Sequence, residues 1–180
     1  MILSFGASGF NYSRWRGDYY PDDMPEEWCF TYYANEFDSV FLAKESTDDL
    51  EQFIDDLDDS FYLLLEDVPE VRDKSKSMDV SEPLNIGYCL FDEEGRESFQ
   101  KFQLDFGKVN FLNKTIENAC VIRASSSEVV TNNDLKSLIE YLVENFQSVS
   151  QVFVFFEGAA STASTIKLAQ MISDLMLKSD

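Results

Sequence analysis

The chain has 180 residues, of which 44% are hydrophobic and 14% aromatic, and its formal net charge is −20. This apolar and aromatic content argues against a disordered chain, and no apolar run approaches the roughly 20 residues of a membrane-spanning helix. The strong negative charge argues against partners such as nucleic acid or an anionic membrane surface.

Short apolar runs alternate with amphipathic stretches along the chain, a pattern typical of βα units. In chain order, we expect strands over residues 2–5, 39–43, 61–65, 84–91, 109–112, 120–124 and 151–156. Helical spacing of apolar residues predicts helices over residues 26–36, 48–57, 96–106, 134–146 and 164–177. Thr47 is the expected N-cap of the second helix, and Asn133 or Thr131 that of the fourth. Residues 68–82 are polar and lack periodicity, which predicts a loop. With no repeats and no obvious linker, we expect a single domain over residues 1–180.

The cysteine and histidine content bears on compartment and metal binding. Cys29, Cys89 and Cys120 are odd in number and lie in hydrophobic surroundings, so we expect reduced core thiols and a cytoplasmic location. No basic region followed by a long apolar core opens the chain, so no signal peptide is expected. With no histidine and no CxxC spacing, few zinc ligands are available, and we expect no metal and no cofactor.

The densest motif runs from residue 6 to residue 21 and is followed by an aromatic helix. Glycines, aromatic residues and a proline recur there at fixed offsets: Gly6, Ser8, Gly9, Tyr12, Trp15, Gly17, Tyr20, Pro21, Tyr32, Tyr33, Ala34, Phe37 and Val40. This set resembles the opening signature of the YecE-like family, domain of unknown function 72. Residues 121–123 and 152–156 look, more loosely, like the seventh and eighth strands of that family.

The resemblance implies a TIM-type barrel, but 180 residues fall below the roughly 200 that such a barrel needs. Residues 109–120 leave no room for two βα units. We therefore expect a shortened or incomplete TIM-barrel-like α/β fold, with six to seven parallel strands and outer helices.

The positions at which the family carries polar residues at the ends of its strands are mostly altered. Phe41 and Ala43 stand where the family has Glu and Asn, Glu66 replaces a Lys, and Leu90 replaces a Gln. Arg123 persists, whereas Glu157 follows the last strand in place of an Asn. Histidine, the side chain best suited to proton transfer near neutral pH, is missing altogether. We therefore expect a catalytically degenerate barrel, and the resemblance implies no established activity.

Six residues are candidate ligand-binding residues: Ser8, Tyr12, Arg14, Trp15, Arg123 and Glu157. Arg123 lies on an apolar strand, and a buried guanidinium requires a carboxylate or a ligand; Glu66 and Glu157 are available as structural partners. The glycine loop lacks the third glycine of a dinucleotide fingerprint and the Lys-Ser/Thr of a P-loop. Its aromatic residues fit either stacking on a ligand or packing in the core. Arg14 and Arg16 fit either an anionic ligand or ion pairs with Asp18, Asp22 and Asp23.

Two functional hypotheses follow. Residues 18–97 hold 25 acidic against 5 basic residues, so the first is a binding or regulatory role in which an acidic surface meets a basic protein. A homodimer through an open sheet edge is a further expectation if barrel units are missing. The alternative is a residual enzyme, or a binder of a small anionic metabolite, that uses Arg123 and the N-terminal aromatic loop at the barrel mouth. Whether the protein is an enzyme stays open.

Overall fold

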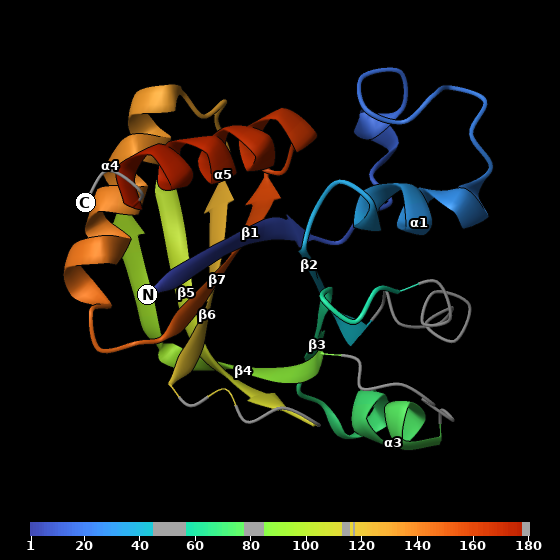
Figure 1. Ribbon diagram of the computed structural model, residues 1–180, viewed down its shortest axis with the longest axis horizontal. Coiled ribbons are helices and arrows are strands. Elements are labelled where there is room, and N and C mark those ends of the chain that lie inside the picture. Colours follow the sequence, from blue (N-terminus) through green and yellow to red (C-terminus); the bar gives the residue numbers. More distant parts are fainter. Residues whose placement is uncertain (45–56, 78–84, 113–115, 117, 178–180) are drawn as a thin grey trace.

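The computed structural model describes residues 1–44, 57–77, 85–112, 116 and 118–177. Seven strands in these residues form one closed barrel, in which each strand neighbours the next along the chain and the last pairs with the first (Figure 1). The strands are β1 (Ile2–Ser8), β2 (Ser39–Leu42), β3 (Tyr62–Glu66), β4 (Asn85–Phe99), β5 (Phe102–Phe111), β6 (Ala119–Ser126) and β7 (Gln151–Gly158).

The barrel is mixed rather than parallel. Strand β5 runs antiparallel to both β4 and β6, whereas the other five neighbouring pairs are parallel. The predicted TIM-barrel-like fold of parallel strands with outer helices is therefore wrong. The sheet closes, so an open edge is not available in the described residues as the basis of the expected homodimer.

The physical reason for this correction lies in residues 96–106, which we predicted to be a helix. They form the arms of a hairpin, with β4 and β5 meeting at Gln100 and Lys101. Phe99, Phe102 and Phe106 fit helical spacing, but Phe102 and Leu104 are buried with exposed Gln103 between them, the two-residue period of a strand.

Helical segments lie outside the barrel. They are η1 (Ser13–Trp15), η2 (Glu26–Trp28), α1 (Cys29–Ala34), α3 (Pro69–Ser77), α4 (Asn132–Asn145) and α5 (Ala163–Leu177). Figure 1 shows α4 and α5 side by side on one flank, with α1 and α3 on the other. Helix α3 occupies a stretch predicted to be a loop, and the helix predicted over residues 48–57, with Thr47 as its cap, falls almost wholly outside the described residues. None of the described helices combines the length and the apolar character needed to cross a membrane.

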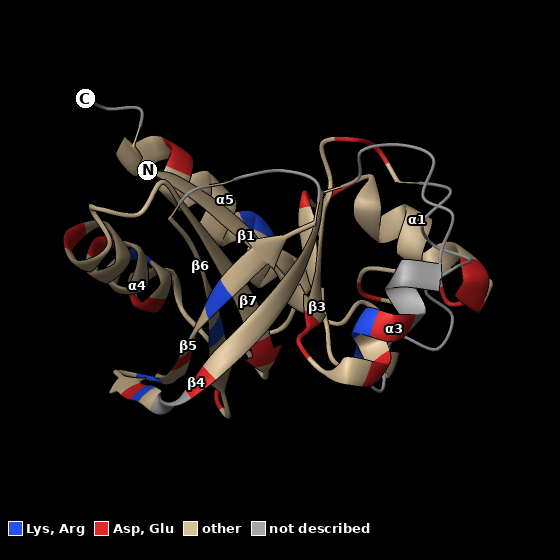
Figure 2. Ribbon diagram, turned by 90° about the horizontal axis from the view of Figure 1, so that it is seen from below, with Lys and Arg blue, Asp and Glu red and all other residues tan. Residues whose placement is uncertain are grey.

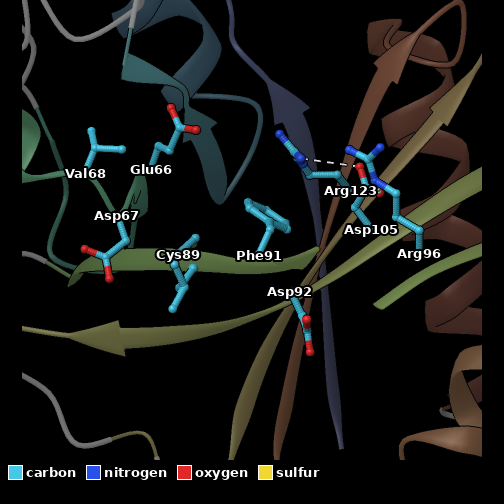
Figure 3. A pocket seen from close by; sticks show the side chains of 10 residues that line it. Glu66, Asp67, Val68, Cys89, Phe91, Asp92, Arg96, Asp105 and Arg123 are labelled. Atoms are coloured by element: carbon cyan, nitrogen blue, oxygen red, sulfur yellow. Dashed lines mark hydrogen bonds and ion pairs between the residues drawn. The ribbon is translucent and has the colours of Figure 1, made fainter. Parts of the chain in front are cut away.

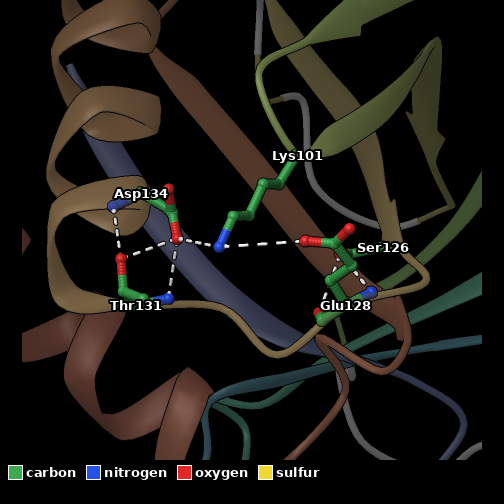
Figure 4. Close-up of polar contacts among 5 residues, drawn as sticks. All are labelled: Lys101, Ser126, Glu128, Thr131 and Asp134. Atoms are coloured by element: carbon green, nitrogen blue, oxygen red, sulfur yellow. Dashed lines mark hydrogen bonds and ion pairs between the residues drawn. The ribbon is translucent and has the colours of Figure 1, made fainter.

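Of the two predicted caps of α4, Thr131 is the one used (Figure 4). Its hydroxyl accepts a hydrogen bond from the Asp134 backbone N–H, and the Asp134 carboxylate accepts one from the Thr131 backbone N–H at 2.8 Å. This reciprocal pair is a capping box. Lys101, in the β4–β5 turn, lies 3.4 Å from Asp134 and so attaches the hairpin to the start of α4.

Two hydrophobic clusters lie on opposite sides of the sheet, one inside the barrel and one outside it. Alternate residues of the strands fill the interior, among them Phe41, Leu64, Cys89, Val121, Phe153 and Phe155. Their neighbours in sequence face outward into the larger cluster under the helices. Toward the C-terminal ends of β3 and β6, the same interior-facing series includes Glu66 and Arg123.

Candidate functional site

A pocket of about 270 Å³ lies at this end of the barrel (Figure 3). Ten residues line it: Glu66, Asp67, Val68, Cys89, Leu90, Phe91, Asp92, Arg96, Asp105 and Arg123. The mouth of a β-barrel is a common place for a small-molecule site. We call this feature the mouth pocket.

Arg123 forms one wall of the mouth pocket. Its guanidinium carbon lies 4.0 Å from the centroid of the Phe91 ring, a cation–π contact. Its Nη2 donates to Asp105 Oδ2 at 3.3 Å, and its Nε lies 3.8 Å from Glu157 Oε1. Of the two carboxylates that the sequence offered as structural partners of Arg123, Glu66 and Glu157, the structure pairs Arg123 with Glu157.

Asp105 is the main residue that the sequence reasoning missed. It is 7% exposed and lies between two guanidinium groups, since its Oδ1 is 2.8 Å from Arg96 Nε. Apolar spacing predicts a helix over its segment, whereas in the structure Asp105 lies opposite Arg123 on the neighbouring strand. The signal that points to Asp105 is a charged side chain within a segment in which apolar and polar residues alternate.

Two buried polar atoms in this cluster have no hydrogen-bond partner in the described structure: Arg123 Nε and Asp105 Oδ1. Both are close to an opposite charge, but neither Glu157 nor Arg96 meets them with hydrogen-bond geometry. Buried donors and acceptors without partners are uncommon in native proteins and each costs about 1–3 kcal/mol. Here the neighbouring charges, at 2.8 Å from Asp105 Oδ1 and 3.8 Å from Arg123 Nε, compensate the two atoms within the wall of the pocket.

The N-terminal aromatic loop does not line this pocket. Trp15 is 2% exposed, donates its indole N–H to the Ser161 carbonyl at 2.9 Å, and stacks on Tyr33. The Tyr12 hydroxyl donates to the Ser8 carbonyl. The aromatic residues thus pack in the core, one of the two alternatives left open by the sequence.

Arg14 and Arg16 also act structurally. Arg14 donates to the carbonyls of Gly158 and Ser161, at 2.8 and 3.0 Å, and its guanidinium lies over the Tyr12 ring. Arg16 donates to the Met24 carbonyl and to Cys29 Sγ. In the described residues these bonds replace the expected ion pairs with nearby acids. Of the six candidate residues, the structure joins Arg123 to Glu157 and leaves Ser8 at the end of β1 and Tyr12, Arg14 and Trp15 in the segment that follows it.

The remaining pocket residues offer little for catalysis. Burial raises the pKa of the Cys89 thiol well above its usual range, which disfavours the nucleophilic thiolate. Asp67 is held by Arg72 through two hydrogen bonds, and Glu66 accepts the backbone N–H of Lys44 at 3.0 Å. Within the described residues, no three Cys, Asp or Glu side chains are placed to hold a metal ion.

These features define a closed, mixed β-barrel protein with a charged pocket at its mouth. One solved structure shares the fold over 99% of this chain and 100% of its own length: a DUF72 family protein from Thermotoga maritima, with a TM-score of 0.60 and 15% sequence identity. The predicted resemblance to domain of unknown function 72 is thereby confirmed at the level of the fold. No family model matches the chain, and no curated protein matches it in sequence.

Proposed function

We propose that this protein is a divergent member of the YecE-like family, domain of unknown function 72, and that it binds a small molecule in the mouth pocket without transforming it. The observation that carries this proposal is the pocket of about 270 Å³ at the barrel mouth, which is lined by the charged cluster of Arg96, Asp105 and Arg123 and, across from it, by Glu66. A ligand with polar groups would complement these charges.

Binding is favoured over catalysis by the state of the reactive groups. The Arg123 charge is balanced by Asp105 and Glu157, and burial keeps Cys89 protonated. No histidine exists to transfer a proton near neutral pH. Balanced charges and a protonated thiol suit recognition better than acid–base or nucleophilic chemistry.

A thermal-shift screen of sugars, amines, carboxylates, nucleotides and phosphorylated metabolites tests the proposal. A ligand at 100 times its dissociation constant stabilises the folded state by about 2.7 kcal/mol, which is a shift of several degrees. Val68→Trp, which places a large side chain at the pocket rim, is expected to abolish the shift. The matched control Val129→Trp, at a residue that is 80% exposed, is expected to retain it. A screen without hits, or hits that survive Val68→Trp, would contradict a ligand site at the mouth.

A second candidate function is docking to a basic protein, and it is favoured by the surface around η2. Glu26 and Glu27 are exposed there beside Trp28, whose side chain is 62% exposed, and Figure 2 shows further acidic residues over the helices and loops. Aromatic anchors are frequent in protein interfaces. Affinity capture with native protein and with Trp28→Ala tests it: a basic partner retained by the native protein and lost with Trp28→Ala supports docking, and equal capture by both contradicts it.

A further inference from the structure

The helical segment formed by η2 and α1 presents two aromatic side chains to solvent. Trp28 is 62% exposed, and Tyr32, one helical turn further along, is 37% exposed. Other side chains of the same segment anchor it to the core, since Cys29, Phe30 and Tyr33 are buried. Exposed Trp and Tyr side chains on a well-anchored helix are typical of surfaces that bind a partner.

The loop that precedes this segment packs against it. The rings of Tyr19 and Tyr20 contact the Tyr32 ring, with centroids 5.3 and 5.7 Å apart. The loop also carries three exposed acidic residues: Asp18, Asp22 and Asp23. On the helical side Glu27, next to Trp28, is exposed as well. The loop and the helix therefore form one surface, on which carboxylates flank aromatic rings.

We call this surface the acidic aromatic face and define it by six residues: Asp18, Asp22, Asp23, Glu27, Trp28 and Tyr32. Among the residues that the structure describes, no Lys or Arg forms an ion pair with any of its four carboxylates. Arg16, the basic residue nearest in sequence, donates instead to the Met24 carbonyl and to Cys29 Sγ. The face thus carries negative charge that a cationic partner would complement.

One cation of the chain itself is already held in this way at a neighbouring position. Lys167 of α5 pairs with Glu36, and its Nζ lies 5.7 Å from the centroid of the Tyr19 ring. A carboxylate and an aromatic ring thus hold one ammonium group between them. Trp28 and Tyr32 offer the same combination of groups, and in the described part of the chain no cation lies over either ring.

We propose that the acidic aromatic face binds an arginine-rich segment of a partner protein, whose guanidinium groups stack on Trp28 and Tyr32 and pair with the surrounding carboxylates. This inference rests on the second candidate function, docking to a basic protein, and names the chemistry of the partner. Arginine suits the face better than lysine because a planar guanidinium stacks on an aromatic ring while it pairs with a carboxylate. Single-stranded nucleic acid also stacks on exposed aromatic rings, but its phosphates carry the same sign of charge as this face.

Three labelled peptides of matched length test the assignment by fluorescence anisotropy with the full chain at physiological salt. Each repeats one residue in alternation with glycine, and that residue is arginine, lysine or citrulline, the uncharged analogue of arginine. The arginine peptide is expected to bind about fivefold more tightly than the lysine peptide, and the citrulline peptide is expected not to bind. Equal binding of the arginine and lysine peptides would overturn the proposal. So would displacement of the arginine peptide by equimolar spermine, which would assign the face to small polycations.

Variants of Trp28 test whether its ring takes part. Trp28→Ala is expected to weaken the arginine peptide about fivefold, whereas Met171→Ala, at a residue of α5 that is 55% exposed, changes nothing. Trp28→Leu keeps an apolar side chain but removes the aromatic ring, so it should lose as much affinity as Trp28→Ala. Full affinity in Trp28→Leu would overturn guanidinium stacking. If either variant fails to fold, the ranking of the three peptides on the native chain decides.

Two isosteric variants separate this face from the acidic surface in general. Glu27→Gln and Glu140→Gln each raise the net charge by one unit, but Glu140 is an exposed residue of α4 paired with Lys136. Glu27→Gln is expected to weaken the arginine peptide about threefold, while Glu140→Gln leaves it unchanged. Equal losses in both variants would assign the binding to diffuse attraction and overturn the proposal.

The outcome also distinguishes this inference from the candidate function on which it rests. A basic protein captured by the native chain and lost with Trp28→Ala, together with equal binding of the arginine and lysine peptides, overturns the preference for arginine but leaves docking at this face. Failure of all three peptides and equal capture by both chains overturns both. Val68→Trp at the mouth pocket should leave peptide binding unchanged.

Discussion

Arg123 and Asp105 are register partners on adjacent antiparallel strands, and Arg123 Nη2 lies 3.3 Å from Asp105 Oδ2. Removal of the carboxylate in Asp105→Asn leaves Arg123 and Arg96 without their shared counter-charge. Because Asp105 is largely buried whereas Arg96 reaches solvent, we expect a loss of about 2 kcal/mol in the free energy of unfolding, below the full cost of breaking a buried pair. Urea unfolding measures this loss, and Glu140→Gln is the exposed control. An unchanged midpoint would contradict a stabilising role for the pair.

The Tyr33 hydroxyl joins β1 to β2, and Tyr33→Phe removes this link. The hydroxyl accepts the backbone N–H of Ala7 and donates to the carbonyl of Ser39, both at 2.9 Å and both buried. The phenylalanine leaves these two backbone groups unsatisfied, so we expect a loss of about 2 kcal/mol. Tyr32→Phe, at a partly exposed ring on the same helix, is the matched control and should cost much less in the same denaturation assay. Equal losses would show that the bridge contributes nothing specific.

Gly6, the first glycine of the N-terminal motif, is required by close packing. A Cβ at this position would overlap the carbonyl oxygen of Ser39, which is backbone and cannot rotate away. We therefore expect Gly6→Ala to destabilise the protein by about 3 kcal/mol, near the upper end of overpacking costs. Gly95→Ala, whose Cβ would be 3.3 Å from the side chain of the exposed residue Asp92, requires only a small shift of that side chain and should cost much less. Thermal unfolding of both variants compares them, and similar melting temperatures would refute the packing argument.

The cap of α4 gives a pH-dependent prediction. Hydrogen bonds from Thr131 hold the pKa of Asp134 below its ordinary value. A lowered folded-state pKa contributes stability that is present above the unfolded pKa and is lost as the pH falls through the folded value. Asp134→Asn is therefore expected to cost about 1 kcal/mol at pH 7, and the difference from the native protein should shrink below about pH 4. Urea unfolding of the native protein and of Asp134→Asn at pH 7, 5 and 3 measures this difference in the free energy of unfolding. A difference that grows on acidification would contradict a lowered pKa of Asp134 in the folded state.

The cysteines give a test of the binding-only proposal. Burial raises the pKa of Cys89 strongly, and that of Cys120 to about 12, so neither thiol is ionised at pH 8. Both should stay unmodified by iodoacetamide in the folded protein and react fully in urea, as followed by mass spectrometry. Rapid labelling of Cys89 in the native state would instead place a reactive thiolate in the mouth pocket and favour an enzyme.

Local sequence patterns were sufficient to predict a strand or a helix where the spacing of the apolar residues fitted only one of the two. The strands β2, β3 and β7 contain unbroken apolar runs, β6 is apolar except for Arg123 and its C-terminal serines, and α4 and α5 carry clear helical spacing. The motif from Gly6 to Pro21 indicated the resemblance to domain of unknown function 72, which the structural match to the DUF72 protein confirms, but the parallel barrel that the resemblance implied is wrong. The segment containing Phe99, Phe102 and Phe106 failed because its spacing suits a helix as well as a strand. Helix α3 was missed because only Val71 of its side chains is buried among those described.

The sequence by itself determined which segments are buried, because burial follows from apolar residues at the period of a strand or a helix. It also determined that Arg123 needs a counter-charge, since a guanidinium on an apolar strand is costly when unpaired. Only the tertiary structure decided the direction of β5 and the partner of Arg123. Both depend on pairing between strands, which brings Asp105 beside Arg123 across 18 residues of chain and leaves no trace in local periodicity.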